Sequence, residues 1–578
     1  MDRLNPHIVP SAGVAGVKAY SVPKHGAPVD LILNANEGQA PPADLLQRIL
    51  AVGPDVMRRY PDTSAVQLLL AQRLGVESAR ILVTAGGDDA LDRLCRAILG
   101  PGKRLLTTDP SFEMLPRYAH IMGAEVREVL WPQGAFPIEE MIAQVTEYTA
   151  LIAFVSPNNP TGSVGTADDL RRLAAAAPHA VIIADLAYVE FADEDITSAA
   201  LTISNCVVVR TLSKAWGLAG LRVGYAIGHP EIIGWMRASG GPYAVARPSV
   251  ALAAARLEQD GGEMEAFVAQ VRKDRAEIEA ALAECGASTT NSQANFVFTL
   301  TENAAWIADA MAGLGIAIRS YPGHARLSNA LRITCPGNAG ECRRVTHAIR
   351  TALLPQAMIF DLDGVIADVS HSYRRAIIDT AASFGANISF EEVVAVKAQG
   401  NANNDWEVTH RLVTTAGKDV PYEAVRERFE ELYQGTEEKP GLRSTEKMLC
   451  DVGVLERIAA MLPIAIVTGR PRGDAERFLK QCDIARLFSH VICMEDAKMK
   501  PDPAPVLLAL QKLGVERAWM IGDTPDDIVA ARAAGVIPLG IIAPGERVEV
   551  SSSVLTRAGA ARVVTQLGDL ETLVREKL

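Results

Sequence analysis

Residues 206–222 read CVVVRTLSKAWGLAGLR and residues 357–365 read AMIFDLDGV, and the fold class can be inferred from these two stretches. In each, a short apolar run of strand length ends in polar side chains, Lys214 in the first and Asp361 and Asp363 in the second. Similar runs alternate with helical segments along most of the chain, which is typical of α/β folds with parallel sheets. We therefore expect an α/β protein whose chemistry lies at the carboxyl ends of its strands.

The predicted strands form two series separated by residues 353–356, LLPQ, the only plausible joint between two domains. A joint this short predicts two domains that pack closely. The first series covers residues 80–84, 150–155, 181–184 and 206–210, and the second covers residues 357–360, 464–467 and 518–521.

Composition excludes several classes of protein. The 578 residues include 57 Lys and Arg against 69 Asp and Glu, and this net charge of −12 disfavours a nucleic-acid binder. No apolar run approaches the roughly 20 residues of a membrane span, and the first residues lack the pattern of a signal peptide. Eight cysteines without a Cys-x-x-Cys pair predict a reducing compartment. We expect a cytoplasmic protein with no nucleic-acid or membrane partner.

Lys214 follows a predicted buried strand, in a turn where its amine could form a Schiff base with an aldehyde cofactor. A lone lysine is more often a solvated surface side chain, but three further motifs accompany this one. Residues 84–91, TAGGDDAL, run from a strand into a helix and predict a phosphate cradle. Residues 156–162, SPNNPTG, offer Asn159, and Asp185 ends an apolar strand where a carboxylate needs a cationic partner.

Over roughly residues 15–350 these motifs, in this order, resemble the pyridoxal-phosphate (PLP) aminotransferases of fold type I, closest to the histidinol-phosphate aminotransferase group. The resemblance implies that Lys214 binds the cofactor covalently and shuttles a proton, and that Asp185 pairs with the pyridinium nitrogen. It implies that Phe112 stacks on the ring and that Asn159 and Tyr188 hydrogen-bond the ring hydroxyl. The implied phosphate ligands are Gly87, Asp88, Thr211, Ser213 and Arg222.

The same resemblance assigns the substrate side and the subunit partner. Arg332 matches the arginine that binds an anionic group of the substrate, with a surface charge at a strand edge as the alternative. Tyr20 and Asn36 match further substrate-side residues, and Tyr60 matches the tyrosine that reaches the cofactor phosphate of the neighbouring subunit, which implies a homodimer. Leu186 stands where the family usually has Glu and Phe112 where a Tyr is common, and we expect the cofactor chemistry to survive both because neither is the electron-sink contact. Departures around residues 36–40 and 333–337 flank the substrate and leave the amino donor open.

The second series carries four polar motifs, three of them at strand ends. Asp361 and Asp363 lie two residues apart on an extended chain and point the same way, so they need a cation, for which Mg²⁺ is suited. Residues 464–470, IAIVTGR, and 520–527, MIGDTPDD, end two further strands, and residues 499–503, MKPDP, supply a lysine. A lone Asp-x-Asp-Gly is more often a capped turn, but four such motifs in order favour a site.

Over roughly residues 356–578 this set resembles the haloacid-dehalogenase-like (HAD) hydrolases. By resemblance Asp361 is the nucleophile and Asp363 the general acid and base. The implied phosphoryl ligands are Thr468, Gly469 and Lys500, and the implied Mg²⁺ site comprises Asp361, Asp363, Asp523 and Asp527.

These motifs predict a domain organisation. Residues 1–354 form the PLP-dependent transferase fold, with a large, mostly parallel-sheet domain (about 45–255) and a small α/β domain (the N-terminal arm and about 256–354). Residues 356–578 form a Rossmann-like HAD core (356–367 and 446–578) with a helical cap (about 368–445). In the cap, residues 399–406, QGNANNDW, are either a substrate-contacting segment or a solvated loop.

We expect a bifunctional enzyme that transaminates histidinol phosphate and imidazole-acetol phosphate with 2-oxoglutarate and glutamate, and that hydrolyses a phosphate monoester, with histidinol phosphate as one candidate. Its substrates would be small phosphorylated amines and 2-oxo acids. Three alternatives stay open: an aminotransferase or decarboxylase of another phosphorylated or aromatic amino acid, a phosphatase for an unrelated metabolite, and a catalytically idle HAD module that stabilises the dimer.

Overall fold

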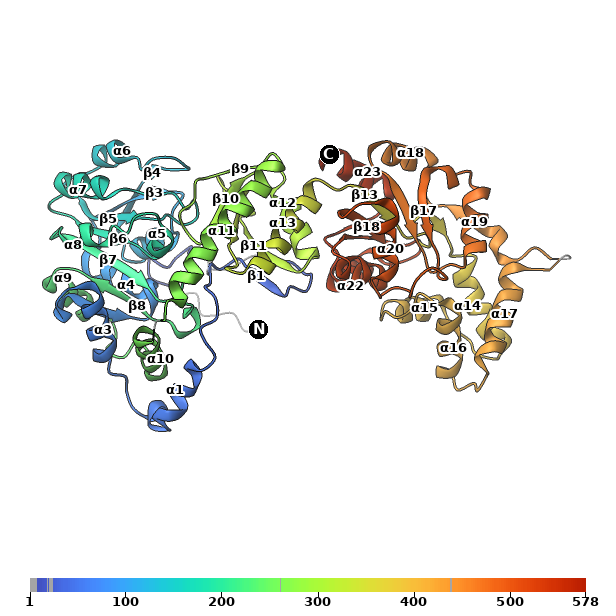
Figure 1. Ribbon diagram of the computed structural model, residues 1–578, viewed down its shortest axis with the longest axis horizontal. Helices are drawn as coiled ribbons and strands as arrows, with labels where there is room; N and C mark the ends of the chain where they lie inside the picture. Colours follow the sequence, from blue (N-terminus) through green and yellow to red (C-terminus); the bar gives the residue numbers. More distant parts are fainter. Residues whose placement is uncertain (1–7, 18, 20–23, 260, 437–438, 578) are drawn as a thin grey trace. The chain divides into compact units, whose positions relative to one another are not determined.

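The computed structural model describes residues 8–17, 19, 24–259, 261–436 and 439–577 (Figure 1). These residues divide into two units. Unit 1 consists of the described residues among 1–22, 33–301 and 330–343, and unit 2 of those among 23–32, 302–329 and 344–578. The predicted joint at 353–356 begins at the last residue of α13 (Ala339–Leu353) and ends directly before β13 (Ala357–Phe360). The predicted domain boundaries stay a proposal.

Unit 1 is built on a seven-stranded sheet in the order β2-β8-β7-β6-β5-β3-β4. Only β8 runs antiparallel to its neighbours, and the other pairs are parallel. The strands are β2 (Ile81–Thr84), β3 (Arg104–Asp109), β4 (Glu125–Leu130), β5 (Thr149–Val155), β6 (Val181–Asp185), β7 (Cys206–Thr211) and β8 (Gly224–Ile227). Val155 and Val209 flank Asp185 in register, so β5, β6 and β7 end at one edge of the sheet.

Helices α4 (Gly86–Ile98), α5 (Met114–Ile121) and α9 (Pro230–Ala238) pack on one face of this sheet. Alternate strand residues such as Leu151, Ala153 and Val155 meet the apolar side of α4 in one buried cluster, because successive side chains of a strand point to opposite faces. The remaining helices of this unit are α1 (Leu45–Val52), α2 (Asp55–Arg58), α3 (Ser64–Leu74), α6 (Ile138–Ala143), α7 (Ala167–Ala176), α8 (Thr197–Leu201), α10 (Arg247–Glu258) and α11 (Glu263–Glu284).

A second group of strands in unit 1 is antiparallel. Strand β10 (Phe296–Leu300) pairs with β12 (Ala330–Thr334) on one side and with β9 (Ser288–Thr289) on the other. Arg332 lies opposite Phe298 in this register. Strand β12 therefore brings Arg332 to the site from a part of the sequence distant from the first sheet.

Unit 2 contains a parallel six-stranded sheet in the order β17-β16-β13-β18-β19-β20. The strands after β13 are β16 (Ile464–Val467), β17 (Phe488–Ile492), β18 (Ala518–Gly522), β19 (Ile537–Ile541) and β20 (Arg562–Val564). Strand β13 lies between β16 and β18, so the motifs that follow these three strands meet at one edge. The surrounding helices are α18 (Val452–Met461), α19 (Arg472–Gln481), α20 (Ala504–Leu513), α21 (Pro525–Ala533), α22 (Val548–Ala558) and α23 (Leu567–Lys577). Two further elements of unit 2 are α12 (Ala304–Gly313) and β11 (Ile316–Ser320), and β1 spans Leu31–Leu33.

The segment between the short strands β14 (Ala367–Asp368) and β15 (Lys447–Met448) holds four helices, which Figure 1 draws as one group in gold. They are α14 (Tyr373–Ser383), α15 (Phe390–Lys397), α16 (Asp405–Thr415) and α17 (Tyr422–Gln434). The short strands β14 (Ala367–Asp368) and β15 (Lys447–Met448) pair where the chain leaves the sheet and returns to it. This is the segment for which the sequence predicts a helical cap.

All seven predicted strands are strands in the structure, with ends that differ by one residue at most. Both candidate sites are positioned by the parallel order of neighbouring strands, β5, β6 and β7 in unit 1 and β16, β13 and β18 in unit 2. Within the described part of the chain, no helix has the length and apolar character that a membrane crossing requires.

Candidate active sites

A cavity of about 580 Å³ opens at the carboxyl ends of the strands of unit 1. It brings together every residue predicted for this site except Tyr60 and Tyr20. Tyr20 falls outside the described residues. The predicted residues that line the cavity are Asn36, Gly87, Asp88, Phe112, Asn159, Asp185, Tyr188, Thr211, Ser213, Lys214, Arg222 and Arg332.

Asp185 is the buried carboxylate of this cavity. Its Oδ1 accepts one hydrogen bond, from the backbone N–H of Ala187 at 3.2 Å, and no ion pair is formed with it among the described residues. Burial raises the pKa of Asp185 to about 7. A buried carboxylate without a cationic partner fits the protonated ring nitrogen of PLP, which would supply that cation.

Lys214 faces the same cavity, three residues after the end of β7. Its Nζ lies 3.2 Å from the carbonyl oxygen of Ala35, to which it donates, and 5.7 Å from the centre of the Tyr188 ring. Burial, together with the positive charge of Arg332, lowers the pKa of Lys214 to about 8. The amine is therefore neutral in a larger fraction of molecules near neutral pH than an ordinary lysine, as a nucleophilic amine requires.

The segment predicted as a phosphate cradle lies where helix α4 begins, beside β7. The guanidinium of Arg222 donates to Asp88 Oδ2 at 3.1 Å, and Thr211 donates to Ser213 Oγ at 2.9 Å. Gly86 has a φ of +81°, and a Cβ there would lie 2.6 Å from Arg222 Nη2. Glycine is therefore needed where the chain turns into the helix, and the donors of Ser213 and Arg222 lie near the helix N-terminus, which favours an anion.

The opposite wall of the cavity carries a hydrogen-bonded network around Arg332 and Asn36. Arg332 donates to the carbonyl oxygen of Asn34 at 2.9 Å and to Asn159 Oδ1, while its buried Nε has no partner among the described residues. Asn36 donates from Nδ2 to the Tyr188 hydroxyl at 3.0 Å. An incompletely bonded guanidinium on a cavity wall suits an anionic ligand group.

Tyr60 lies away from this cavity. Its side chain is 75% exposed and stacks on Tyr243, with ring centres 4.3 Å apart. This exposure leaves the ring available to a second subunit, and the role predicted for Tyr60 stays a prediction.

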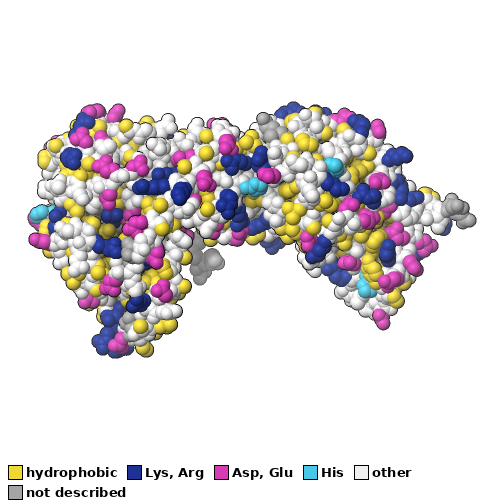
Figure 2. All heavy atoms as spheres, in the orientation of Figure 1, with side chains coloured by type: hydrophobic (Ala, Val, Ile, Leu, Met, Phe, Trp, Pro, Cys, Tyr) yellow, Lys and Arg dark blue, Asp and Glu magenta, His cyan; other side chains and the backbone are white. Residues whose placement is uncertain are grey.

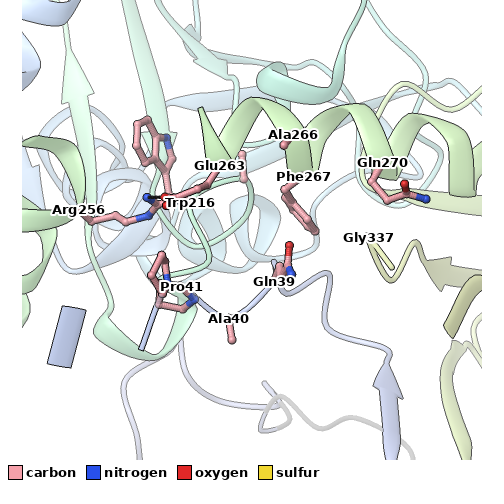
Figure 3. A pocket seen from close by; sticks show the side chains of 12 residues that line it. Gln39, Ala40, Pro41, Trp216, Arg256, Glu263, Ala266, Phe267, Gln270 and Gly337 are labelled. Carbon is pink, nitrogen blue, oxygen red and sulfur yellow. Dashed lines mark hydrogen bonds and ion pairs between the residues drawn. The ribbon is translucent and has the colours of Figure 1, made fainter. Parts of the chain in front are cut away.

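A second pocket of unit 1, of about 430 Å³, contains none of the predicted residues (Figure 3). It is lined by the loop Gln39–Pro42, by Trp216, two residues after Lys214, and by α11 residues such as Phe267. The Arg256 guanidinium at its edge is already paired with Glu263 at 2.6 Å. We assign it no function.

The polar residues of unit 2 converge at the ends of β13, β16 and β18. One carboxylate oxygen each of Asp361, Asp523 and Asp527 lies within 4.8 Å of the others. Lys500 Nζ donates to Asp361 Oδ1 at 2.7 Å and to Asp527 Oδ1 at 2.5 Å. Burial raises the pKa of Asp523 well above its usual range, opposed by the Arg374 guanidinium. Three carboxylates so close together form a donor set that fits Mg²⁺.

Two of the predicted residues take other positions around this group. Thr468 is buried beside it, and its Oγ1 accepts from the backbone N–H of Arg470 at 3.1 Å. The side chain of Asp363 pairs with Arg470 instead of joining the other three carboxylates. A Cβ on Gly469 would lie 2.8 Å from the carbonyl oxygen of Asn403, so a residue with a side chain would push against the loop between α15 and α16.

Residues 399–406, which comprise most of this loop and the start of α16, contact the site and are not simply a solvated loop. Asn403, Asn404, Asp405 and Trp406 line a small cavity together with Asp363 and other residues of the sheet edge. The backbone N–H groups of Asn401 and Ala402 both donate to the Asp526 carboxylate at 2.8 Å. Of the two interpretations of this segment, the geometry favours substrate contact.

Several residues of the two sites are not among the predicted site residues. In unit 1 these are Asn34, Asn295, Thr334, Met114 and Tyr118, and in unit 2 they are Arg374, Glu446, Arg470 and Asp526. Arg470 and Asp526 lie within the quoted motifs of residues 464–470 and 520–527, so their positions in these motifs could have singled them out. The others reach their sites only through long-range folding.

Comparison with known proteins assigns a family to each of two parts of the chain, residues 33–349 and residues 355–535, which are called below the aminotransferase unit and the hydrolase unit. Residues 33–349 match the family described as aminotransferase class I and II. The chain belongs to this family. Residues 355–535 match the haloacid dehalogenase-like hydrolases. Both resemblances stated from the motifs are confirmed, as are the α/β fold class and the presence of an aminotransferase and a hydrolase in one chain.

Three relatives illustrate this similarity. Over 359 residues the chain is 32% identical to a protein of Paracoccus denitrificans named histidinol-phosphate aminotransferase, covering 60% of this chain and 97% of that one. It is 35% identical over 305 residues to an aromatic amino acid aminotransferase of Mycolicibacterium paratuberculosis (51% and 84% covered). It is 44% identical over 236 residues to a Phytophthora nicotianae protein named imidazoleglycerol-phosphate dehydratase (38% and 52% covered), so it spans only about half of that relative.

A solved histidinol-phosphate aminotransferase from Sinorhizobium meliloti, in complex with pyridoxal-5'-phosphate, has the same fold. The TM-score is 0.54 at 24% identity, over 59% of this chain and 96% of that one. Class I and II aminotransferases use PLP, and HAD-like hydrolases typically use Mg²⁺, so the predicted cofactors are those of the two families. The aminotransferases act on small molecules and are commonly dimeric.

Proposed function

We propose that the chain is a bifunctional enzyme of histidine biosynthesis. Its aminotransferase unit would interconvert imidazole-acetol phosphate and histidinol phosphate with glutamate and 2-oxoglutarate, and its HAD-like unit would hydrolyse histidinol phosphate. The observation that carries the proposal is the joining, in one chain, of similarity to a histidinol-phosphate aminotransferase over 97% of that protein with a hydrolase unit that has a phosphatase-like set of carboxylates. A transaminase whose product is a phosphate ester would then hand it to a phosphatase.

In the aminotransferase unit, PLP when bound supplies an electron sink for the substrate Cα. Asp185 would hold its ring nitrogen, and Asn159 and Tyr188 its ring hydroxyl. Its phosphate would bind Thr211, Ser213, Arg222 and the α4 N-terminus. Lys214, with its lowered pKa, would carry the proton between the substrate Cα and the C4′ carbon of the cofactor, as transamination requires. Arg332 would bind an anionic group of the substrate.

In the hydrolase unit, Asp361 Oδ would attack phosphorus while the bond from phosphorus to the leaving oxygen breaks and Asp363 gives that oxygen its proton. A phosphorylated Asp361 results. Asp363, now a carboxylate, would take a proton from water as the water oxygen attacks phosphorus, which releases Asp361 and inorganic phosphate. Asp361, Asp523 and Asp527 would hold Mg²⁺, and Thr468, Gly469 and Lys500 would bind the phosphoryl oxygens.

We also propose a homodimer formed through the aminotransferase unit, in which Tyr60 reaches the neighbouring site. The exposed Tyr60–Tyr243 stack supports this arrangement. We propose a reducing, cytoplasmic location, which the eight free cysteines support. On the face drawn in Figure 2, acidic and basic side chains are interspersed, as on a protein whose ligands are small molecules.

The first test is phosphate release from L-histidinol phosphate by the purified full chain with Mg²⁺, compared with Asp361→Asn and Lys214→Ala. We expect release by the wild type and by Lys214→Ala but not by Asp361→Asn, with a higher kcat/KM than for generic phosphate esters. Absence of release would reject the histidinol phosphatase and would leave an idle module or another metabolite as the explanation.

The second test compares histidinol phosphate with phenylalanine as amino donor to 2-oxoglutarate. The similarity to an aromatic amino acid aminotransferase makes that activity the second candidate function. A kcat/KM for phenylalanine above that for histidinol phosphate would favour it. Carbon dioxide release from an amino acid substrate would indicate a decarboxylase instead.

A further inference from the structure

Arg470 is a deeply buried charged side chain near the hydrolase site. It follows β16, two residues after Thr468, and is 1% exposed. Its Nε donates to Asp363 Oδ1 at 2.6 Å, and its Nη1 donates to Glu446 Oε2 at 2.9 Å. The rings of Tyr373 and Phe478 lie 4.9 and 5.3 Å from the guanidinium carbon. Because a buried charge needs well-placed partners, these contacts hold the guanidinium in one orientation.

Glu446 extends this contact to the four helices α14–α17. Its Oε1 accepts from Ser372 Oγ at 2.9 Å and from the Tyr433 hydroxyl at 3.0 Å. Ser372 immediately precedes α14, Tyr433 lies on α17, and Glu446 immediately precedes β15. Both chain connections between the helices and the sheet therefore belong to one buried network that ends at Asp363.

Asp363 is held through only one of its two carboxylate oxygens. Both contacts with Arg470 involve Oδ1, and across the described residues no hydrogen bond reaches Oδ2. The Asp363 side chain is 26% exposed, whereas Arg470 is sealed off. Such an arrangement fixes the direction of the carboxylate and leaves one oxygen available to a leaving group.

We propose that Arg470 is a positioning residue: it aims Asp363 Oδ2 at the leaving oxygen of the substrate and, through Glu446, makes this aim depend on the placement of α14–α17. The inference rests on the proposed phosphatase activity and deepens it, because it names the step that the network serves. That step is the transfer of a proton from Asp363 to the leaving oxygen as the bond to phosphorus breaks.

The proposal separates two kinds of phosphate ester. An alkyl ester such as glycerol phosphate needs protonation of its leaving oxygen, because an alkoxide is a poor leaving group. p-Nitrophenyl phosphate needs little, because nitrophenolate leaves as the anion. General acid catalysis contributes roughly 10²–10⁴-fold where a proton is required. Misdirection of Asp363 should therefore slow phosphoryl transfer from the alkyl ester selectively. The value of kcat/KM reports this step, whereas the later hydrolysis of phosphorylated Asp361, in which Asp363 acts as the base, is common to both esters and affects kcat for both.

The experiment measures kcat and KM for both esters, with Mg²⁺, on the full-length wild type, Arg470→Lys, Arg470→Gln, Glu446→Gln and Asp363→Asn. The matched control is Arg472→Gln, an arginine two residues away that pairs with Asp496 and Glu476. For Arg470→Gln we expect kcat/KM for the alkyl ester to fall about 100-fold and kcat/KM for p-nitrophenyl phosphate to fall less than about fivefold. Arg470→Lys should recover part of this loss. Glu446→Gln keeps the side-chain volume and should show the same selective loss for the alkyl ester, with a smaller fold-change.

Equal losses of kcat/KM on both esters, or none, in variants that unfold at the wild-type temperature would overturn the proposal. If Arg470→Gln does not fold, the same comparison of the two esters is made with Glu446→Gln and Tyr433→Phe, and the same outcomes support or overturn the proposal. A wild type that releases phosphate from neither ester and not from histidinol phosphate would instead reject the phosphatase function itself, so the two failures are distinguishable. Selectivity that matches Asp363→Asn supports the positioning role.

Discussion

Lys214 shares its cavity with the positive charge of Arg332, and this neighbour is one cause of its lowered pKa of about 8. Arg332→Gln should raise the pKa of Lys214, since a like charge disfavours the protonated amine and its removal favours it. The protonated form does not react with the aldehyde of PLP. At a pH of about 7.5, below the pKa of Lys214, the apo-enzyme of Arg332→Gln should therefore capture PLP about three- to tenfold more slowly than the wild type.

The measurement is the rate of PLP capture as a function of pH, followed by absorbance. Arg237→Gln, on the exposed side of α9, is the control and should keep the wild-type midpoint. A midpoint for Arg332→Gln that stays at the wild-type pH, or moves below it, would contradict the electrostatic coupling.

Asp523 belongs to the three carboxylates that fit Mg²⁺. A ligand that binds only the folded state stabilises it, by about 2.7 kcal/mol at a concentration 100 times its Kd. We expect Mg²⁺ to raise the unfolding temperature of the hydrolase unit in the wild type and to lose most of that effect in Asp523→Asn. Calorimetry with Mg²⁺ and with a chelator measures both, with Asp379→Asn as control, a carboxylate on α14 that pairs with Arg375. An equal rise in Asp523→Asn would argue against this site.

Among the structural elements, the loop between α15 and α16 is anchored to the sheet edge by one carboxylate. Asp526 is 3% exposed and accepts from Asn401 N–H, Ala402 N–H and Asn403 Nδ2, at 2.8, 2.8 and 3.2 Å. Each such bond contributes on the order of 1 kcal/mol net. Asp526→Ala should free the loop and raise KM for a phosphate ester about tenfold with a smaller change in kcat, while Asp526→Asn should be intermediate.

Hydrogen exchange checks the cause of this effect. The amides of Asn401 and Ala402 should exchange faster in Asp526→Ala than in the wild type. Unchanged exchange together with a raised KM would mean that Asp526 acts on the neighbouring Asp527 and not on the loop.

For the complete molecule, the proposed homodimer makes a test by subunit mixing possible. If Tyr60 completes the site of its partner, Tyr60→Ala and Lys214→Ala subunits each lack a different component. A mixed dimer then contains one site with both residues intact. Random exchange of subunits should restore transaminase activity to about a quarter of the wild-type level, because half of the dimers are mixed and each has one complete site.

The activity is measured before and after the two inactive variants are dissociated and reassociated together. No recovery, with exchange demonstrated by a size-tagged subunit, would place Tyr60 in the site of its own chain. Phosphate release should be equal in both variants, since neither residue belongs to the hydrolase unit.

The strands and the residues at their ends could be predicted from the amino-acid sequence without any tertiary information. Val181–Asp185 and Ala357–Asp361 are apolar runs that terminate in a carboxylate, and in parallel sheets such ends meet at one edge. Together with the family motifs, this local pattern was sufficient to predict the cavity residues Lys214, Asp185 and Arg332 and the cluster of Asp361, Asp523 and Asp527.

The partners of these residues, in contrast, became known only from the folded chain. Arg332 meets Asn159 across 173 positions, and Asp363 meets Arg470 across 107 and not the other carboxylates. The loop at residues 401–403 meets Asp526 at separations of 125, 124 and 123 positions. These contacts leave no periodic signal, because hydrophobic patterning reports which face of an element is buried and not which distant polar group it meets. Burial and pairing of charges arise when the sheets assemble, and they set the pKa of Lys214 and the direction of Asp363.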